Sequence, residues 1–260
     1  MTGNLKNHIK NQWHYFLIAI MFFTRIPIQF NHFDEADLNK STRFLSLVGI
    51  LVGAFGALVF WLCNKLLPLE IAVLLSMAAT ILLTGAFHED GLADAADGLG
   101  GGWSKEQVLT IMLDSRLGSY GAVGLVLVLL TKYQVLSYHA AASIPAAMIA
   151  GHALSRWCAV LVMFTQNYVK VEGKSKPLAT RLNRSELTIA TFFGLLPMMF
   201  LEMKHLVALT PVIIVWLWFS AKIKARIGGY TGDCLGAMQQ LTEVAFYIGL
   251  LASATLFAKA

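Results

Sequence analysis

The chain has 260 residues, of which 57% are hydrophobic and only 13% are charged, and its formal net charge is +5. This composition argues against a soluble protein, which needs a larger charged surface. The apolar residues form continuous stretches of about 20 residues, which indicates helices that cross a bilayer and not the alternating pattern of a membrane β-barrel. Cys63, Cys158 and Cys234 form neither a disulfide nor a zinc-binding pattern. We therefore expect one all-α membrane domain over residues 1–260, without a nucleic-acid partner.

The first apolar stretch covers residues 13–30 and is interrupted by Arg25 and Pro27. It is compatible with a spanning helix, a re-entrant segment or an interfacial helix, and the sequence leaves these three open. Lysines precede the stretch, as in a signal peptide, but no small-residue cleavage site follows, so we expect the segment to be retained. The remaining apolar runs predict a polytopic helical bundle of about seven transmembrane helices, at 44–63, 69–87, 117–136, 140–164, 187–201, 206–220 and 241–257.

Basic residues orient this bundle, because cytoplasmic loops retain lysine and arginine. Loops 31–43, 88–116, 165–186 and 221–240 would lie on one side and hold twelve such residues: Lys40, Arg43, Lys105, Arg116, Lys170, Lys174, Lys176, Arg181, Arg184, Lys222, Lys224 and Arg226. The other side would hold four, namely Lys65, Lys132, Lys204 and Lys259. We predict a multi-pass protein of the cell inner membrane, with the first group of loops facing the cytoplasm.

An acidic segment follows the run that ends at residue 87. Its carboxylates are Glu89, Asp90, Asp94 and Asp97, next to His88. On a helix, the three aspartates have i, i+4 and i+7 spacing and share one face, with neighbours about 5–6 Å apart. Such a row repels itself unless a cation neutralises it, and carboxylate oxygens favour Mg²⁺ over Zn²⁺. We interpret the segment as a magnesium site, with Asp97, Asp94 and His88 as catalytic candidates; a solvated acidic loop is the alternative.

Two neighbouring motifs fit a phosphate-bearing substrate. The glycines at 98 and 100–102 let a diphosphate approach the backbone, although glycine runs also occur in plain turns. Asp114, Ser115 and Arg116 then precede an apolar run, where Arg116 and backbone N–H groups could hold phosphate. A helix cap with a topology-setting arginine explains this second motif equally well.

A third motif lies inside the predicted span 140–164. His152 and Arg156 are four residues apart and therefore share a helix face. An arginine at the centre of a membrane helix costs about 2.5–3.5 kcal/mol on insertion scales, so it needs a partner. We favour a phosphate or carboxylate partner for Arg156 over a purely structural pairing.

The last polar cluster contains Gly228, Gly229, Thr231 and Asp233. Asp233 could supply a further metal ligand and the glycines and Thr231 a substrate contact, whereas a glycine-rich turn capped by Asp233 is the simpler interpretation. Lys174 lies in a basic run that could attract an anionic substrate, although the topology rule alone also explains it. Acids, arginines and glycine turns at one membrane face together suit phosphoryl transfer with metal assistance.

The motifs HEDGLADAADGLGGG, DSRLGSYG, GHALSRW and GGYTGDCLGA, at 88–102, 114–121, 151–157 and 228–237, resemble the cobalamin synthase family, also called adenosylcobinamide-GDP ribazoletransferases. The resemblance covers most of the chain in order, beginning at the FTRIP run of residues 23–27. It implies a membrane enzyme that joins adenosylcobinamide-GDP to α-ribazole or its 5′-phosphate and releases GMP, with Mg²⁺ as cofactor. By motif, the metal ligands fall on Glu89, Asp90, Asp94 and Asp97, with Asp233 as a further candidate.

Two other interpretations stay open. CDP-alcohol phosphotransferases also place acids beside a membrane span, but their pattern has Ala-Arg soon after the second Asp-Gly, which this sequence lacks. A cation transporter would carry its acids near the middle of the membrane, whereas these begin at the end of a predicted span. The sequence identifies neither the general base nor the number of metal ions, and it leaves a homo-oligomer open.

Overall fold

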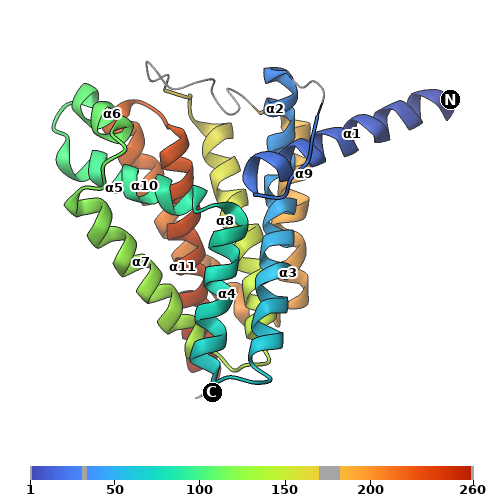
Figure 1. The fold of residues 1–260 in the computed structure, drawn as a ribbon, viewed down its shortest axis with the longest axis vertical. Coiled ribbons are helices and arrows are strands. Elements are labelled where there is room, and N and C mark those ends of the chain that lie inside the picture. The colour runs from blue at the N-terminus through green and yellow to red at the C-terminus, as the bar shows by residue number, and fades with distance from the viewer. Residues whose placement is uncertain (1, 31–33, 170–181, 259–260) are drawn as a thin grey trace.

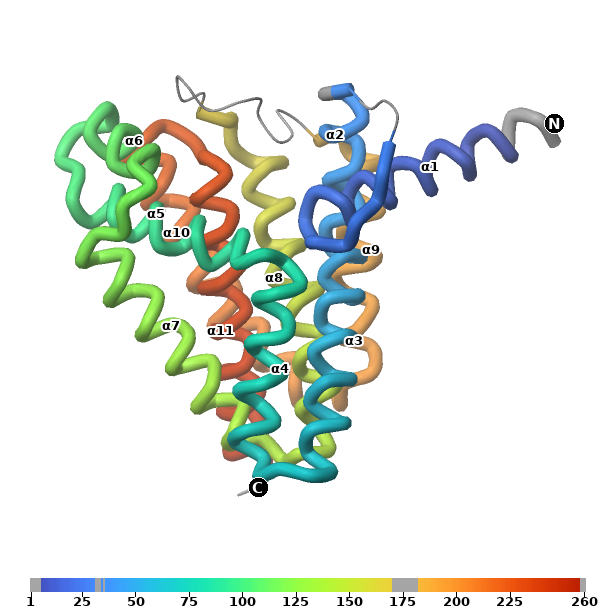
Figure 2. The backbone as a smooth tube through the Cα atoms, in the orientation of Figure 1, coloured from blue at the N-terminus to red at the C-terminus, as the bar shows by residue number. Residues whose placement is uncertain are grey.

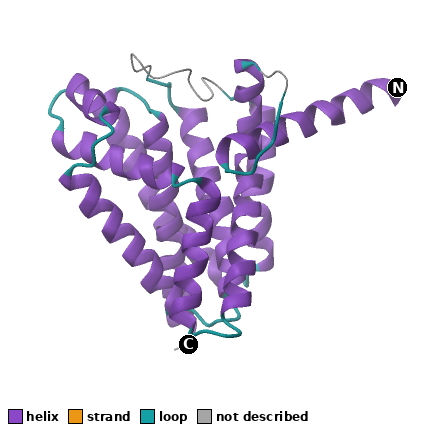
Figure 3. Cartoon of the chain, in the orientation of Figure 1, coloured by secondary structure: helices purple, strands orange, loops and turns teal. Residues whose placement is uncertain are grey.

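The computed structural model describes residues 2–30, 34–169 and 182–258. These residues form a helical bundle, and their one extended pairing is an isolated bridge between Tyr168 and Tyr230 (Figure 3). The α-helices are α1 (Thr2–Phe23), α2 (Glu35–Ser41), α3 (Leu45–Cys63), α4 (Leu69–Thr84), α5 (Phe87–Gly101), α6 (Lys105–Leu113), α7 (Ser119–Ser137), α8 (Ile144–Thr165), α9 (Arg184–Leu195), α10 (Leu209–Ile227) and α11 (Gly232–Ala258). Short 3₁₀ helices, η1 (Thr42–Phe44), η2 (Leu196–Phe200) and η3 (Met203–Ala208), connect some of them. The all-α membrane fold predicted from the composition is confirmed.

Fewer helices can cross a membrane than the apolar runs suggested. Within the described ranges, five spans are long and apolar enough, and a sixth results if α4 and α5 form one broken span. The expectation of about seven was too high, because the run 187–201 does not form one long helix. Helix α9 has only 12 residues and gives way to η2, where Pro197 lacks the N–H that would continue an α-helix.

Helix α8 lies at the centre of the bundle, between α3 and α11, and most of its side chains are buried. Gly49 and Gly53, one turn apart on α3, make the close contact with α8. A Cβ atom at Gly53 would lie 2.7 Å from Ile149 Cα and 2.8 Å from Met148 O. Glycines spaced four residues apart let membrane helices approach closely where burial from water gives no driving force.

The chain turns sharply between α4 and α5. Gly85 and Ala86 both have left-handed backbone conformations, with φ of 69° and 58°, and the axes of the two helices differ by 87°. Arg25 packs against this elbow, where its backbone N–H donates to Leu83 O at 2.7 Å. As a result α5 runs across one end of the bundle, beside α6 and near the ends of α8 and α10 (Figure 1). We call this the α5 end; the turn between α3 and α4 and the C-terminus lie at the opposite end (Figure 2).

Helix α1 begins away from the bundle and reaches it near α2 and α9 (Figure 1). It is not among the candidate spans in the described part of the chain. Residues 13–23 belong to α1 and residues 24–30 are not helical, so the stretch 13–30 does not form one continuous helix.

Two assignments of polar residues to loops were wrong. The last span begins at Gly232 and not near Leu241, so Gln239 and Gln240 are helical and buried and do not belong to a loop. Lys132, which had been counted as a loop charge, lies within α7 and is buried against Glu243. Both errors arise because polar residues inside the bundle resemble loop residues when only the sequence is known.

Candidate active site

The acidic segment, counted within the loop 88–116, forms helix α5, the condition under which its aspartates share one face, and its acids fall into two groups. Asp90 is exposed, Asp94 is half-buried and Asp97 is buried, and the spacing of the three places them along one side of the helix. Glu89 and His88 are buried and lie on other sides of α5. The predicted aspartate row therefore exists, but Glu89 does not belong to it.

Asp97 has a structural role that the sequence did not reveal. Its carboxylate accepts hydrogen bonds from the backbone N–H groups of Gly118 and Gly121, both at 2.8 Å. These N–H groups belong to the unpaired first turn of α7, which carries partial positive charge. Asp97 therefore caps α7 from a distance of more than 20 residues in the chain, and a Cβ atom at either glycine would collide with its carboxylate.

An open pocket of about 450 Å³ lies beside this cap. Its lining residues come from α5, from α6 and from the segment that starts α7: Asp97, Gly101, Ile111, Asp114, Arg116, Leu117, Gly118, Ser119 and Tyr120. Arg116 is highly exposed and donates to Asp114 through both Nε and Nη2, the latter at 2.6 Å. Hydrogen bonds from Arg116 lower the pKa of Asp114 from 3.8 to about 2. The pocket thus brings Asp97, Asp114 and Arg116 together, whereas Ser115 is exposed outside its lining.

The start of α11 packs directly against α5. A Cβ atom at Gly91 would lie 3.1 Å from Asp233 Cα, and one at Gly236 would lie 3.0 Å from His88 O. The glycines bring the backbone of Asp233 next to the turn of α5 that carries Asp90 and Asp94. His88 lies buried at this contact and lines a cavity of about 30 Å³, apart from the open pocket.

Glu89 points into the bundle. Its Oε1 accepts a hydrogen bond from Gln240 Nε2 of α11 at 2.8 Å. Its Oε2 is buried and has no hydrogen-bond partner among the residues described. A buried carboxylate oxygen without a partner costs free energy, so this position favours an additional polar ligand or water.

Arg156 and His152 share a face of α8, as their spacing predicted. Arg156 Nη1 donates to His152 O at 3.0 Å and lies 3.1 Å from His152 Nδ1. Arg156 is only 2% exposed and lies close enough to Glu243 and Glu89 to interact electrostatically. Arg156 Nε is buried and has no hydrogen-bond partner among the residues described, and a phosphate partner for Arg156 stays a prediction.

A buried ion pair between α7 and α11 was not anticipated. Lys132 Nζ of α7 lies 2.7 Å from Glu243 Oε1 of α11, with both side chains almost fully buried. Tyr247 OH donates to the same carboxylate at 3.1 Å, and His152 Nδ1 lies 3.4 Å from Glu243 Oε2. A lysine inside the apolar run 117–136 was the signal, since the argument made for Arg156 applies equally to it.

The glycine motif at residues 228–237 stabilises the local structure between α10 and α11. Gly228 ends α10 with a φ of 83°, and a side chain at Gly229 would collide with Asn167 O. Thr231 Oγ1 accepts from Cys234 N at 3.3 Å and so caps α11, the role first considered for Asp233. The predicted substrate contacts of Gly228, Gly229 and Thr231 stay untested, and Lys174 lies outside the described residues.

Arg226 was counted only as a topology charge. In the structure its guanidinium donates to Leu99 O, at 3.2 Å, and to Gly102 O. These carbonyls end α5, where a cation offsets the negative end of the helix dipole. Arg226 therefore holds the far end of the helix that carries the acids.

The donor set suits a hard divalent cation in its chemistry, because Asp90, Asp94 and Asp233 offer carboxylate oxygens near one helix contact. In the described residues no three His, Cys, Asp or Glu side chains converge closely enough to form a metal site. One or two carboxylates are still enough for Mg²⁺, which is commonly held by one or two carboxylates together with substrate phosphates. Metal binding at this row therefore stays a proposal.

Comparison with known proteins decides the family. A family model described as cobalamin-5-phosphate synthase matches residues 15–251. The chain belongs to the cobalamin-5-phosphate synthase family. Proteins named adenosylcobinamide-GDP ribazoletransferase from Shewanella frigidimarina and Ralstonia pickettii are 45% and 44% identical to it; the alignments cover 97% and 95% of this chain and 98% of each relative. No solved structure matches the chain.

This result confirms the family that the motifs resembled, and the family match starts near the buried end of α1. The relatives carry the name of a transferase, which favours the ribazoletransferase interpretation over the CDP-alcohol phosphotransferase and the transporter.

Proposed function

We propose that this chain joins adenosylcobinamide-GDP to α-ribazole or its 5′-phosphate and releases GMP. The observation that carries the proposal is the aspartate row of α5 beside the open pocket that holds Arg116, at one end of a membrane bundle of this family. Relatives that align over nearly the whole chain carry the name of this activity.

The reaction is a phosphoryl transfer between two oxygens. The ribazole hydroxyl oxygen forms a bond to the cobinamide-bearing phosphorus, while the bond from that phosphorus to the bridging oxygen of the diphosphate breaks. GMP leaves with the bridging oxygen, and the hydroxyl proton passes to a base. A carboxylate within hydrogen-bond reach is the type of group that accepts such a proton, and Asp90 and Asp94 are the accessible candidates.

We assign the diphosphate to the open pocket. Arg116 presents planar donors that match phosphate oxygens, and its partner Asp114 holds the side chain near the pocket until substrate arrives. The first turn of α7 adds positive dipole at the same place, although Asp97 already uses the N–H groups of Gly118 and Gly121. Mg²⁺, held by Asp233 and by one of Asp90 and Asp94, would neutralise charge that develops on the diphosphate, and the other aspartate would stay available as the base.

We also propose the cytoplasmic face of the cell inner membrane for the α5 end. Lys132 lies inside the bundle and not in a loop of the opposite end. The opposite end therefore has one basic residue fewer than was counted, and the predicted excess of basic residues at the α5 end is larger. A nucleotide-linked substrate made in the cytoplasm would then reach the pocket without crossing the bilayer.

The test uses the purified protein in liposomes with adenosylcobinamide-GDP, α-ribazole 5′-phosphate and Mg²⁺, with GMP release as the readout. Arg116→Gln should raise the KM for the nucleotide-linked substrate, because this exposed arginine is a binding group and not part of the core. Glu106→Gln is the matched control, since Glu106 is an exposed residue of neighbouring α6 outside the pocket. Unchanged kinetics in Arg116→Gln would remove Arg116 from the proposed binding site.

A further inference from the structure

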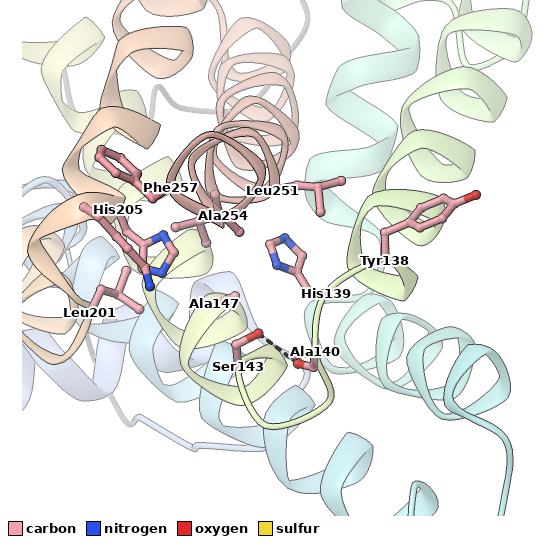
Figure 4. A pocket seen from close by; sticks show the side chains of 12 residues that line it. Tyr138, His139, Ala140, Ser143, Ala147, Leu201, His205, Leu251, Ala254 and Phe257 are labelled. Carbon is pink, nitrogen blue, oxygen red and sulfur yellow. Dashed lines mark hydrogen bonds between the residues drawn. The ribbon is translucent and has the colours of Figure 1, made fainter. Parts of the chain in front are cut away.

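A second cavity lies at the opposite end of the bundle, away from the acids. It has a volume of about 240 Å³ and is formed by the segment between α7 and α8, by the turn between η2 and η3, and by the last part of α11. Figure 4 shows His139 and His205 on either side of this space, with Leu251, Ala254 and Phe257 around it. Its volume is just below the roughly 300–1,000 Å³ of sites for drug-sized ligands, which suits a small polar group.

The hydrogen bonds around His205 bear on which of its ring nitrogens is an acceptor. Ser253 Oγ lies 2.8 Å from Leu250 O and 2.7 Å from His205 Nδ1. When the hydroxyl donates to the carbonyl oxygen, which can only accept, it accepts the proton of His205 Nδ1. In the neutral ring, His205 Nε2 then carries a lone pair and can only accept.

His139 also keeps one ring nitrogen as a hydrogen-bond acceptor. Its Nε2 lies 3.3 Å from Tyr247 O, a carbonyl oxygen that can only accept, so Nε2 carries the proton. Burial lowers the pKa of His139 below its usual 6.5, so the ring is neutral at pH 7 and Nδ1 is an acceptor. Two neutral imidazoles thus each keep one acceptor nitrogen for a ligand with N–H donors.

An ion pair, Lys204 with Glu202, lies beside these acceptor nitrogens. Lys204 lines the cavity, and its Nζ lies 2.7 Å from Glu202 Oε2. Glu202 is largely exposed, so this pair is accessible and offers both a cation and an anion. A ligand that carries both a phosphate and an ammonium group would match Lys204 through its phosphate, and the imidazoles and Glu202 through its ammonium.

Much of the remaining lining of the cavity is apolar. Leu201, Leu251 and Phe257 line it, and Phe257 is half exposed. Met199, Phe200 and Met203, which precede or surround the Lys204 turn, are each about 80% exposed. Exposed apolar residues next to a polar cavity at the end of a membrane bundle indicate the boundary between acyl chains and headgroups.

We propose that this cavity binds the headgroup of an amine-bearing phospholipid, with ethanolamine N–H groups donated to His139 Nδ1 and His205 Nε2 and the phosphate held by Lys204. The acyl chains lie against Leu251 and Phe257. The site is independent of the active-site assignment, because it lies at the other end of the bundle.

The experiment compares three lipids with identical acyl chains. The delipidated protein in detergent is mixed with equal amounts of phosphatidylethanolamine, phosphatidylcholine and phosphatidylglycerol, and bound lipid is counted by native mass spectrometry. The choline headgroup carries the same charges as ethanolamine but has no N–H donor. We expect roughly five- to tenfold more ethanolamine lipid than choline lipid on the protein, as two hydrogen bonds predict.

Variants locate the site. His205→Phe should remove the preference. Lys204→Gln should lower the retention of all three lipids, because each carries the phosphate, and His8→Phe, on the exposed part of α1, should change neither result. Equal retention of the ethanolamine and choline lipids by the unmodified protein would overturn the proposal without any variant, as would a preference for phosphatidylglycerol. A folded His205→Phe protein that still prefers ethanolamine would overturn it too.

Discussion

The buried pair Lys132 and Glu243 offers the sharpest test of the fold. The change is Lys132→Met, which keeps the length and apolar stem of the side chain but removes the ammonium group. In the structure this group lies 2.7 Å from Glu243 Oε1 and 3.5 Å from Gln240 Oε1, at the contact between α7 and α11. The substitution leaves Glu243 with no cation at hydrogen-bond distance apart from the ring of His152.

The expected loss follows from the burial of the remaining charge. Removing one partner of a buried ion pair costs about 3–5 kcal/mol. Glu243 keeps hydrogen bonds from Tyr247 and Gln239, which argues for the lower end of this range. At about 2–4 °C per kcal/mol for a chain of this length, the melting temperature should fall on the order of 10 °C.

The assay follows thermal exposure of the buried thiols of Cys158 and Cys234 with a thiol-reactive fluorescent dye. Lys224→Met is the matched control, because Lys224 is exposed near the end of α10. Adding Glu243→Gln to Lys132→Met should restore at least half of the lost stability, since both charges are then gone. A melting temperature for Lys132→Met within about 2 °C of the unmodified protein, or strictly additive effects in the double variant, would refute the buried-pair interpretation.

Three further predictions concern single positions. Asp97→Asn should cost about 1–3 kcal/mol of stability, because the amide has one oxygen and cannot accept from both Gly118 and Gly121. The control Asp90→Asn, at an exposed position, should melt like the unmodified protein. Equal melting temperatures of the two variants would contradict the capping role of Asp97. Gly53→Ala should cost about 1–3 kcal/mol through its collision with α8, while Gly124→Ala, where the nearest atom is 3.4 Å away, should be neutral in the same thermal assay. The effect of Arg116→Gln on KM should stay constant from pH 5 to 8. The pKa of Asp114 is lowered from 3.8 to about 2, so the Asp114–Arg116 pair stays charged over this whole pH range. A KM effect that disappears between pH 5 and 8 would argue for another titrating partner.

The sequence predicted the features that depend on local periodicity. Apolar runs predicted a helical membrane protein, and the i, i+4 spacing of His152 and Arg156 correctly predicted their shared face. The acidic segment was counted within the loop 88–116 and treated as a helix only conditionally; it forms α5, and its alanines favour a helix that begins after the glycine elbow.

Contacts between distant helices were not predictable from periodicity. Asp97 was interpreted only as a member of an acidic row, although its bonds go to α7; nothing in the local pattern separates a cap acceptor from a metal ligand. Lys132 lies inside the predicted run 117–136 but was counted with the loop charges, and its pairing with Glu243 was not predictable because the two residues are more than 100 positions apart. Thr231 caps α11, which begins at Gly232, nine residues before the predicted run 241–257, whereas the sequence suggested a glycine-rich turn capped by Asp233.

The central claim is metal-dependent transfer at the α5 end, and GMP release tests it most directly. The protein in liposomes receives adenosylcobinamide-GDP and α-ribazole 5′-phosphate, with Mg²⁺ or with EDTA, and Asp94→Asn is measured beside it. The proposal predicts GMP and corrinoid product in equal amounts, loss of both with EDTA, and a decrease on the order of 100-fold in a folded Asp94→Asn variant. GMP release that persists with EDTA and in Asp94→Asn would contradict it.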